Sequence, residues 1–515
     1  MTTFYRDPIS RRRLLSGAGV GAGSLLLAAH GLSASKAFAA PRFGDSPFTL
    51  GVASGDPAPD GVALWTRLAP EPLTGDGGMP ARKVPVQWQV ATDEQFRRVA
   101  RRGTTFATPE LGHAVHVDVD GLQPGREYFY RFKAGPELSP IGRTKTAPAF
   151  GATPAELAFA FTSCQNYPDG YYTSHQNLAR EDLDVVLQLG DYIYEGTAQG
   201  TLGRGHLPAT EAMSVADYRI RHAQYRSDPN LQAAHAAFPW IVAFDDHEVE
   251  NNWAGTDSDP DTDPQDFLAR RARAFQVYYE HMPLRRPQRP QGPDIQLYRR
   301  VAYGDLLAFD VLDTRQYRSD QPPCRDADCA EAFDEQRTIL GQTQERWLYA
   351  QLAASRSRWN VIAQQVPVYE DADVGLPADK WEGYRASRRR LIEFLGQSRP
   401  SNPVVVGGDV HFNSAANLKA DFDDPASATV ASEFVGTSMS TGGDGTPTTT
   451  YDPDPANPHI RFVNKGQRGY VRCTVDAKQC RSDYRVVDTV RSPTSPISTL
   501  ASFVVQDRSP GVQRA

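Results

Sequence analysis

Four apolar segments of this chain are each followed at once by side chains that can bind metal ions. The apolar segment 240–244 runs directly into Asp245-Asp246-His247-Glu248, and four ionisable residues in a row are costly to bury without cations. In open α/β sheets, ligands bind beyond the carboxyl ends of the strands. We therefore expect a fold in which four strand ends meet at one site. The other three ends carry Cys164, then Asp191 with Tyr194, and then Asp409 with His411.

Each of these strand ends also has an ordinary structural explanation. A Gly-Asp pair after a strand, as at Gly190-Asp191, is commonly a capped turn. A buried Cys is more often a small apolar residue than a ligand, and a Tyr near a strand end usually belongs to the core. The Asp-Asp-His-Glu run and the presence of four such ends favour a metal site over these explanations.

The chemistry of these side chains indicates which ions they would bind. A thiolate, a phenolate and an imidazole around one ion suit Fe³⁺ or Zn²⁺, and the phenolate favours Fe³⁺ because a strongly acidic ion is needed to hold tyrosinate near neutral pH. The carboxylates Asp191, Asp246 and Asp409 suit a hard divalent ion such as Ca²⁺. Asn251 and Asn252 could add amide oxygens or serve as turn residues.

The order of apolar segments predicts an α/β chain with two domains after a leader. Short segments of period two between turn signals predict a β-sandwich over residues 44–150. From 155 to 515, buried strands alternate with helices, which predicts a layered β-sheet core flanked by helices. The Thr-, Gly-, Asp- and Pro-rich segment 440–458 is expected to be a surface loop. The helices are predicted at 174–181, 266–281, 342–355 and 385–396.

The N-terminus is typical of an export signal. Ser10-Arg11-Arg12-Arg13 precedes a Gly- and Ala-rich apolar run at 18–29, and Ala37-Phe38-Ala39 is a small-x-small cleavage site. Residues 1–40 are therefore predicted to be a twin-arginine signal peptide read by the Tat export machinery. The apolar run is shorter than the ~20 residues that span a bilayer. We expect a periplasmic or extracellular protein without stable membrane insertion.

The charge balance limits the partners of the chain. Its 55 Lys and Arg and 62 Asp and Glu give a formal net charge of −7, which argues against general nucleic-acid binding. A small anionic substrate remains compatible with this charge, because a bound metal ion supplies positive charge locally. We expect a monomer that binds a small anionic substrate.

Five cysteines fit an oxidising compartment. Cys324 with Cys329, and Cys473 with Cys480, could each close a small loop. Cys164 is then left unpaired, and its place after a strand favours a chemical role.

The metal-binding segments resemble a variant of the calcineurin-type metallophosphoesterase pattern. More closely, the chain is similar to the PhoD-type alkaline phosphatase/phosphodiesterase family, whose leader and β-domain it also shares. The spacing of Leu122, Pro124, Gly125 and Tyr128 looks like the tyrosine corner of fibronectin type III-like modules. The matching segments are 48–67, 163–165, 190–195, 245–253, 312–318, 364–367 and 407–411.

This resemblance implies roles for individual residues. One Fe³⁺ would be held by Cys164, Asp191, Tyr194 and His411, and one Ca²⁺ by Asp191, Asp246 and Asp409. A second Ca²⁺ is compatible with the pattern, but its ligands are not assigned. His247 would contact the substrate and protonate the leaving group.

Three further positions have open interpretations at this stage. Gln365 stands near a position where the superfamily has another ligand His. Arg315 and Arg318 could contact phosphate, or could form a structural ion pair beside Asp313.

The expected reaction is in-line attack of a metal-bound hydroxide on phosphorus, with Asp191 bridging two ions about 3.5–4 Å apart. The chain would then be a secreted metal-dependent alkaline phosphatase that releases inorganic phosphate. The alternative at the same site is a phosphodiesterase or phospholipase D-like enzyme. A non-catalytic binding module would not need the Asp-Asp-His-Glu run, and a Ser or Cys hydrolase lacks a Gly-x-Ser-x-Gly elbow and a base for Cys164.

Overall fold

The protein is described by a computed structural model over residues 43–258, 262–324, 329–371, 378–451 and 455–515. The predicted signal peptide, residues 1–40, lies outside the described residues. Among the helices of the described ranges, none combines the length and the apolar character needed to cross a bilayer.

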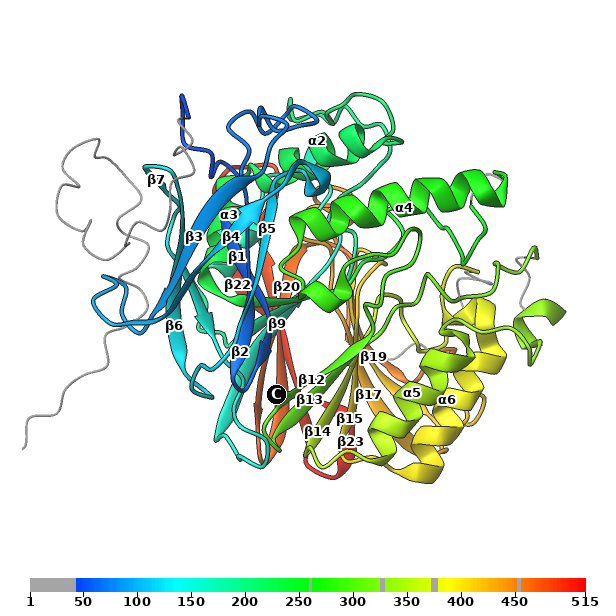
Figure 1. The fold of residues 1–515 in the computed structure, drawn as a ribbon. Helices are drawn as coiled ribbons and strands as arrows, with labels where there is room; N and C mark the ends of the chain where they lie inside the picture. The colour runs from blue at the N-terminus through cyan, green and yellow to red at the C-terminus, as the bar shows by residue number, and fades with distance from the viewer. Residues whose placement is uncertain (1–42, 259–261, 325–328, 372–377, 452–454) are drawn as a thin grey trace, which may run out of the picture.

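Two large mixed sheets form the centre of the molecule (Figure 1). The ten-stranded sheet has the spatial order β23 (Ser509–Arg514), β22 (Ile497–Gln506), β21 (Gln479–Val487), β20 (Arg468–Asp476), β9 (Glu156–Thr162), β10 (Val185–Gln188), β11 (Pro239–Val242), β1 (Val52–Ala58), β2 (Gly61–Arg67) and β5 (Ala114–Val119). The eight-stranded sheet has the order β12 (Arg299–Tyr303), β13 (Leu307–Val311), β14 (Trp359–Ala363), β15 (Pro403–Gly407), β17 (Thr429–Val435), β16 (Asn413–Lys419), β19 (Ile460–Asn464) and β18 (Thr449–Thr450).

The two sheets pack face to face over a shared apolar core. Phe159 on β9 meets Phe309 on β13 edge to face, with ring centroids 5.0 Å apart. Strands β13 to β15 are buried at every position and consist mainly of apolar residues, because both faces of this sheet are covered. Val404 and Val406 face the shared core, whereas Val405 faces the helices on the outside.

Helices cover the outer faces of both sheets. Helices α5 (Gly341–Ala353) and α6 (Arg385–Ser398) lie on the eight-stranded sheet (Figure 1). Helices α1 (Thr173–Leu178), α2 (Val215–Arg226), α3 (Pro229–Ala237) and α4 (Pro264–His281) lie on the side of the ten-stranded sheet. The predicted layered α/β core flanked by helices is therefore confirmed.

The predicted N-terminal β-sandwich is also present. A second sheet of β4 (Val99–Ala107), β3 (Val84–Ala91), β6 (Glu127–Ala134), β7 (Glu137–Leu138) and β8 (Gly142–Lys145) packs against β1, β2 and β5. The backbone N–H of Gln123 donates a hydrogen bond to the Tyr128 hydroxyl at 2.8 Å, which confirms the tyrosine corner.

The sandwich is joined to the C-terminal α/β region by strand pairing. Strand β1 pairs in parallel with β11, and Gly55 is the register partner of Trp240. One sheet therefore runs without a break from the metal-binding strand ends into the N-terminal domain.

Two helices, α2 and α3, were not predicted from the sequence. Helix α2 buries Arg221, His222 and Arg226, so its inward face carries polar residues and its apolar period is weak. The short helix α3, nine residues long, follows at once. The expected loop 440–458 contains the two-residue strand β18, and its first residues, Ser440 and Thr441, are buried.

Of the two expected disulfides, one is present. Cys324 and Cys329 are bonded, whereas Cys473 and Cys480 are both buried free thiols. In the β20–β21 hairpin Cys473 lies opposite Ser482, and Cys480 lies opposite Val475. The two thiols are diagonal neighbours rather than direct partners, and the expectation of a second bond is wrong.

His116 offers a test of how the two parts are packed. Its Nε2 lies 3.0 Å from the carbonyl oxygen of Met282, its ring stacks on Tyr279, and burial lowers its pKa to about 4. Between pH 6.5 and 4 the unfolded chain binds a proton at this position and the folded chain does not, so this residue's contribution to stability is lost as the pH falls. When the pH falls from 7.5 to 5, the free energy of unfolding of His116→Gln should therefore fall by about 2 kcal/mol less than that of the wild type. Urea denaturation at both pH values measures this difference, and a difference that is constant with pH would show that His116 is not held neutral.

Candidate active site

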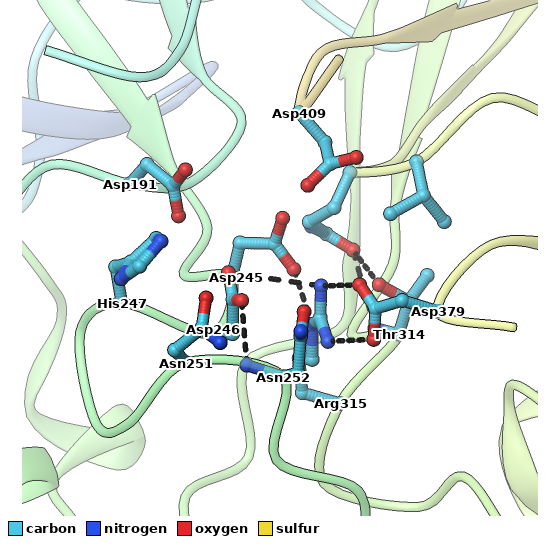
Figure 2. Close-up of polar contacts among 12 residues, drawn as sticks. Asp191, Asp245, Asp246, His247, Asn251, Asn252, Thr314, Arg315, Asp379 and Asp409 are labelled. Atoms are coloured by element: carbon cyan, nitrogen blue, oxygen red, sulfur yellow. Dashed lines mark hydrogen bonds and ion pairs between the residues drawn. The ribbon is translucent and has the colours of Figure 1, made fainter. Parts of the chain in front are cut away.

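The carboxyl ends of strands from both sheets meet at one site. Cys164 follows β9, Asp191 follows β10, Asp246 follows β11, and Asp409 and His411 follow β15. Figure 2 shows the carboxylates of Asp191, Asp246 and Asp409 around one space, with His247 beside them. The predicted convergence of four strand ends is what the structure shows.

The ligand atoms fall into three overlapping groups, and within each group they lie no more than 4.8 Å apart. Asp191 is shared by the first two groups and Asp246 by the last two, which is the arrangement expected of bridging carboxylates. The groups are Cys164, Asp191 and His411; Asp191, Asp246 and His247; and Asp245, Asp246 and Asp409.

Tyr194 completes the first group. Its hydroxyl donates to Asp191 Oδ2 at 2.8 Å and lies 3.2 Å from His411 Nε2. The hydroxyl of Thr441 donates to the Tyr194 oxygen at 3.0 Å. Burial and the nearby carboxylate of Asp191 raise the pKa of the phenol well above its usual value, so only a strong cation would hold it as a phenolate.

The backbone at the site is held in an unusual conformation. Cys164, Asp191, Asp409 and His411 have φ angles of 57°, 55°, 67° and 57°. A non-glycine residue in this left-handed region costs on the order of 1–3 kcal/mol, and such residues persist where the surrounding structure fixes them. Here the N–H of Cys164 donates to the carbonyl of Gly190 at 3.1 Å, which ties two strand ends together.

Two glycines allow the strand ends to come this close. A Cβ on Gly190 would lie 2.4 Å from the Cβ of Asp245, and the residue has φ +120°. A Cβ on Gly408 would lie 2.2 Å from the Oγ of Ser163. The first glycine brings β10 against β11, and the second brings the end of β15 in one sheet against the end of β9 in the other.

The buried carboxylate of Glu248 positions two metal-binding residues at once. It accepts hydrogen bonds from the backbone N–H groups of Asp191 at 3.2 Å, Tyr192 at 2.6 Å and Asp245 at 2.8 Å. These bonds fix the turn after β10 relative to the turn after β11.

Glu195 holds His247 in place. Its carboxylate accepts from His247 Nδ1 at 2.8 Å and from the N–H of Asn251 at 2.8 Å. Burial alone would lower the pKa of His247, but the carboxylates of Asp246, Glu195 and Asp191 outweigh it and raise that pKa well above the usual value. The direct bond to Glu195 favours the protonated form of His247.

The carboxylates themselves show that the site fits metal ions. Burial first, and then repulsion by Asp246, raise the pKa of Asp191 well above its usual value, and burial raises that of Asp409 to about 6. The Oδ1 atoms of Asp191 and Asp246 are buried without a hydrogen-bond partner among the described residues. Cations between these groups would relieve the repulsion and give both oxygens a partner.

The arginines after β13 are structural. Arg315 is fully buried; its Nε donates to Asp245 at 2.5 Å, and its two terminal nitrogens donate to Asp379 at 2.6 and 2.7 Å (Figure 2). Arg318 also donates to Asp379, at 2.8 Å. Arg315 and Arg318 could have contacted phosphate or formed a structural ion pair beside Asp313. The structure shows ion pairs, but the partners are Asp379 and Asp245 instead of Asp313.

Gln365 joins two strand ends and is not available as a ligand. Its Oε1 accepts from both the N–H and the hydroxyl of Thr314, and its Nε2 donates to the carbonyl of Leu312 at 3.0 Å. The interpretation of Gln365 as a metal ligand is therefore wrong.

Sequence reasoning overlooked several residues of the site. Asp245 stands in the Asp-Asp-His-Glu run, and its place there could have suggested a ligand. Glu195 and Glu248 stand next to predicted ligands, but the sequence does not indicate their hydrogen bonds. Asp379 and Thr441 come from distant loops and carry no signal in the sequence.

Comparisons with known proteins agree with this geometry. The family described as PhoD-like phosphatase matches residues 159–484, and the one described as PhoD-like phosphatase, N-terminal domain, matches residues 33–148. The chain is 49% identical over 534 residues to alkaline phosphatase D of Bacillus subtilis (strain 168), and the match covers 99% of this chain and 90% of that protein.

Two solved structures have a fold similar to that of this chain. A structure of PhoD, 49% identical, superposes with a TM-score of 0.87 over 92% of this chain and 93% of that one. The purple acid phosphatase PPD1 of yellow lupin (Lupinus luteus) shares the fold at 14% identity, with a TM-score of 0.54 over 88% of this chain and 73% of that one. The chain therefore belongs to the PhoD-like phosphatase family.

Proposed function

We propose that this enzyme is an exported, metal-dependent alkaline phosphatase that hydrolyses small phosphate esters and releases inorganic phosphate. The observation that carries the proposal is the chain of three ligand groups linked by Asp191 and Asp246, because a cluster of adjacent cations suits a phosphoryl group. Membership of the PhoD-like phosphatase family supports the same reaction.

The donor chemistry supports one Fe³⁺ and one or two Ca²⁺. Cys164, Asp191, Tyr194 and His411 would hold Fe³⁺, since thiolate, phenolate and imidazole suit this ion. When bound, the ions supply Lewis acidity, which lowers the pKa of a coordinated water and neutralises phosphoryl oxygens. The carboxylates that would hold Ca²⁺ are Asp191, Asp246 and Asp409, with Asp245 able to join them around a second ion.

His247 has the properties of a proton donor to the leaving group. Its Nδ1 is bonded to Glu195, which leaves Nε2 free to face the substrate. The ring of Tyr194 packs against its ring, with centroids 4.1 Å apart, and fixes its plane. The carboxylate of Glu195 favours the charged form of the imidazole, and a charged imidazole can give its proton to an alkoxide.

Removing the proton donor should slow the reaction most for poor leaving groups. His247→Gln should lower kcat on an alkyl phosphate by about 10²- to 10⁴-fold and on a nitrophenyl phosphate by much less, with iron and calcium contents unchanged. Glu195→Gln is the matched variant, because it keeps the imidazole but weakens its orientation, and it should show a smaller loss. Near-wild-type turnover of the alkyl phosphate by His247→Gln would exclude this role.

Calcium removal should abolish turnover and calcium addition should restore it, because the acidic groups cannot hold an anionic ester without cations. The assay uses a nitrophenyl phosphate monoester and the matching bis-ester, with metal contents measured in parallel. The ratio of the two rates decides between an alkaline phosphatase and the alternative, a phosphodiesterase or phospholipase D-like enzyme. Full activity in protein shown to be free of calcium would contradict the proposal.

We further propose that the protein is exported by the Tat machinery and acts as a monomer in the periplasm or outside the cell. The support is the Arg pair of residues 11 and 12, the apolar run and the cleavage site in residues 1–40. The double variant Arg11→Lys, Arg12→Lys should leave the uncleaved precursor in the cytoplasm, as cell fractionation would show. Normal export of this variant would contradict the use of that route.

A further inference from the structure

Lys380 differs from the two arginines of the site in its exposure. Lys380 Nζ lies 4.0 Å from Asp409 Oδ2, and the Lys380 side chain is 27% exposed. The Arg315 and Arg318 side chains are 0% exposed. Since a substrate reaches the site from solvent, Lys380 is accessible to it and the two arginines are not.

The other cations near the ligands are also occupied by the protein. Arg315 and Arg318 donate to Asp379, as described above. Arg468 donates to the carbonyl oxygens of Gly443 and His411 at 2.8 and 2.7 Å. Among the described residues, Asp409 is the one carboxylate within 4.0 Å of the Lys380 ammonium, and at that distance the contact is an ion pair rather than a hydrogen bond.

Lys380 is adjacent to the ligand groups through Asp409. Asp409 belongs to the third group, whose ligand atoms lie within 4.8 Å of one another, and its Oδ2 is 4.0 Å from Lys380 Nζ. The ammonium therefore lies beside the carboxylates that would hold an ion.

The backbone under Lys380 is fixed while its side chain is free to reorient. On one side, Asp379 is held by Arg315, Arg318 and Gln321. On the other, Trp381 is 1% exposed and donates to Gln364. A flexible four-carbon stem on a fixed base suits contact with a substrate oxygen, because the ammonium has three donors that can turn toward it.

We propose that Lys380 contacts the phosphoryl group of the substrate and makes this enzyme favour phosphate monoesters over diesters. The inference rests on the proposed phosphatase function. A monoester carries close to two negative charges at alkaline pH, because its second pKa is near 6, whereas a diester carries one. In a space lined by carboxylates, one accessible positive charge stabilises the dianion more than the monoanion. Ions held by the carboxylates would compete with Lys380 for Asp409, which would leave the ammonium available to the substrate.

The test compares Lys380→Met with Lys380→Arg in the metal-loaded enzyme. We expect Lys380→Met to lower kcat/KM for nitrophenyl phosphate by about tenfold or more, mainly through KM, and to change the value for the bis-ester by less than about threefold. Lys380→Arg should keep most of the monoester preference because it keeps the charge. The matched control is Lys465→Met, which removes an exposed Lys that lies over the Phe412 ring next to His411, and it should leave the ratio unchanged.

A second measurement does not depend on turnover. Inorganic phosphate should raise the melting temperature of the wild-type enzyme, and its Kd should increase about tenfold in Lys380→Met at equal iron and calcium contents. Equal losses on both esters together with a lower metal content would overturn the proposal and make Lys380 a support of the metal site. If the metal-loaded wild type hydrolyses neither ester, the phosphatase proposal fails, and the phosphate-binding comparison still decides the role of Lys380.

Discussion

The structure depends on bringing Asp191, Asp245, Asp246 and Asp409 together in a buried space. Like charges at this distance repel, and burial adds to the cost of ionising them. Arg315 and His247 offset part of this negative charge. Each of them is itself held in place by a carboxylate. The remaining negative charge is what the ions would neutralise. Asp379, which holds Arg315, and Glu195, which holds His247, therefore both serve to stabilise this cluster of carboxylates.

The same requirement explains the backbone at the strand ends. Ligands that leave from different strands of two packed sheets can converge only if the chain turns sharply after each strand. The left-handed conformations of Cys164, Asp191, Asp409 and His411, and the two glycines that permit close approach, produce those turns. Four ligand residues therefore have a strained backbone, while the strands that carry them are regular and mainly apolar.

The layered fold, the sandwich and the convergence of strand ends could all be predicted, because apolar period and strand-end chemistry are local features of the sequence. Helix α2 could not, since Arg221, His222 and Arg226 are buried beside its apolar residues and make its apolar period weak. Asp379 and Thr441 enter the site from loops far along the chain, and only tertiary packing brings them there. Gln365 was misassigned because a glutamine at a strand end can bind a metal or join two turns, and its partner Thr314 is 51 residues away.

The pairing of β1 with β11 has a consequence for how this protein can be divided. Strand β11 carries the Asp-Asp-His-Glu run at its end, and its outer edge is covered by a strand from the N-terminal sandwich. Without that sandwich, β11 would become an open edge with unpaired N–H and C=O groups, which invites pairing with another chain. The C-terminal region therefore depends on the sandwich for the pairing of one of its own strands, because a single hydrogen-bonded sheet passes through both.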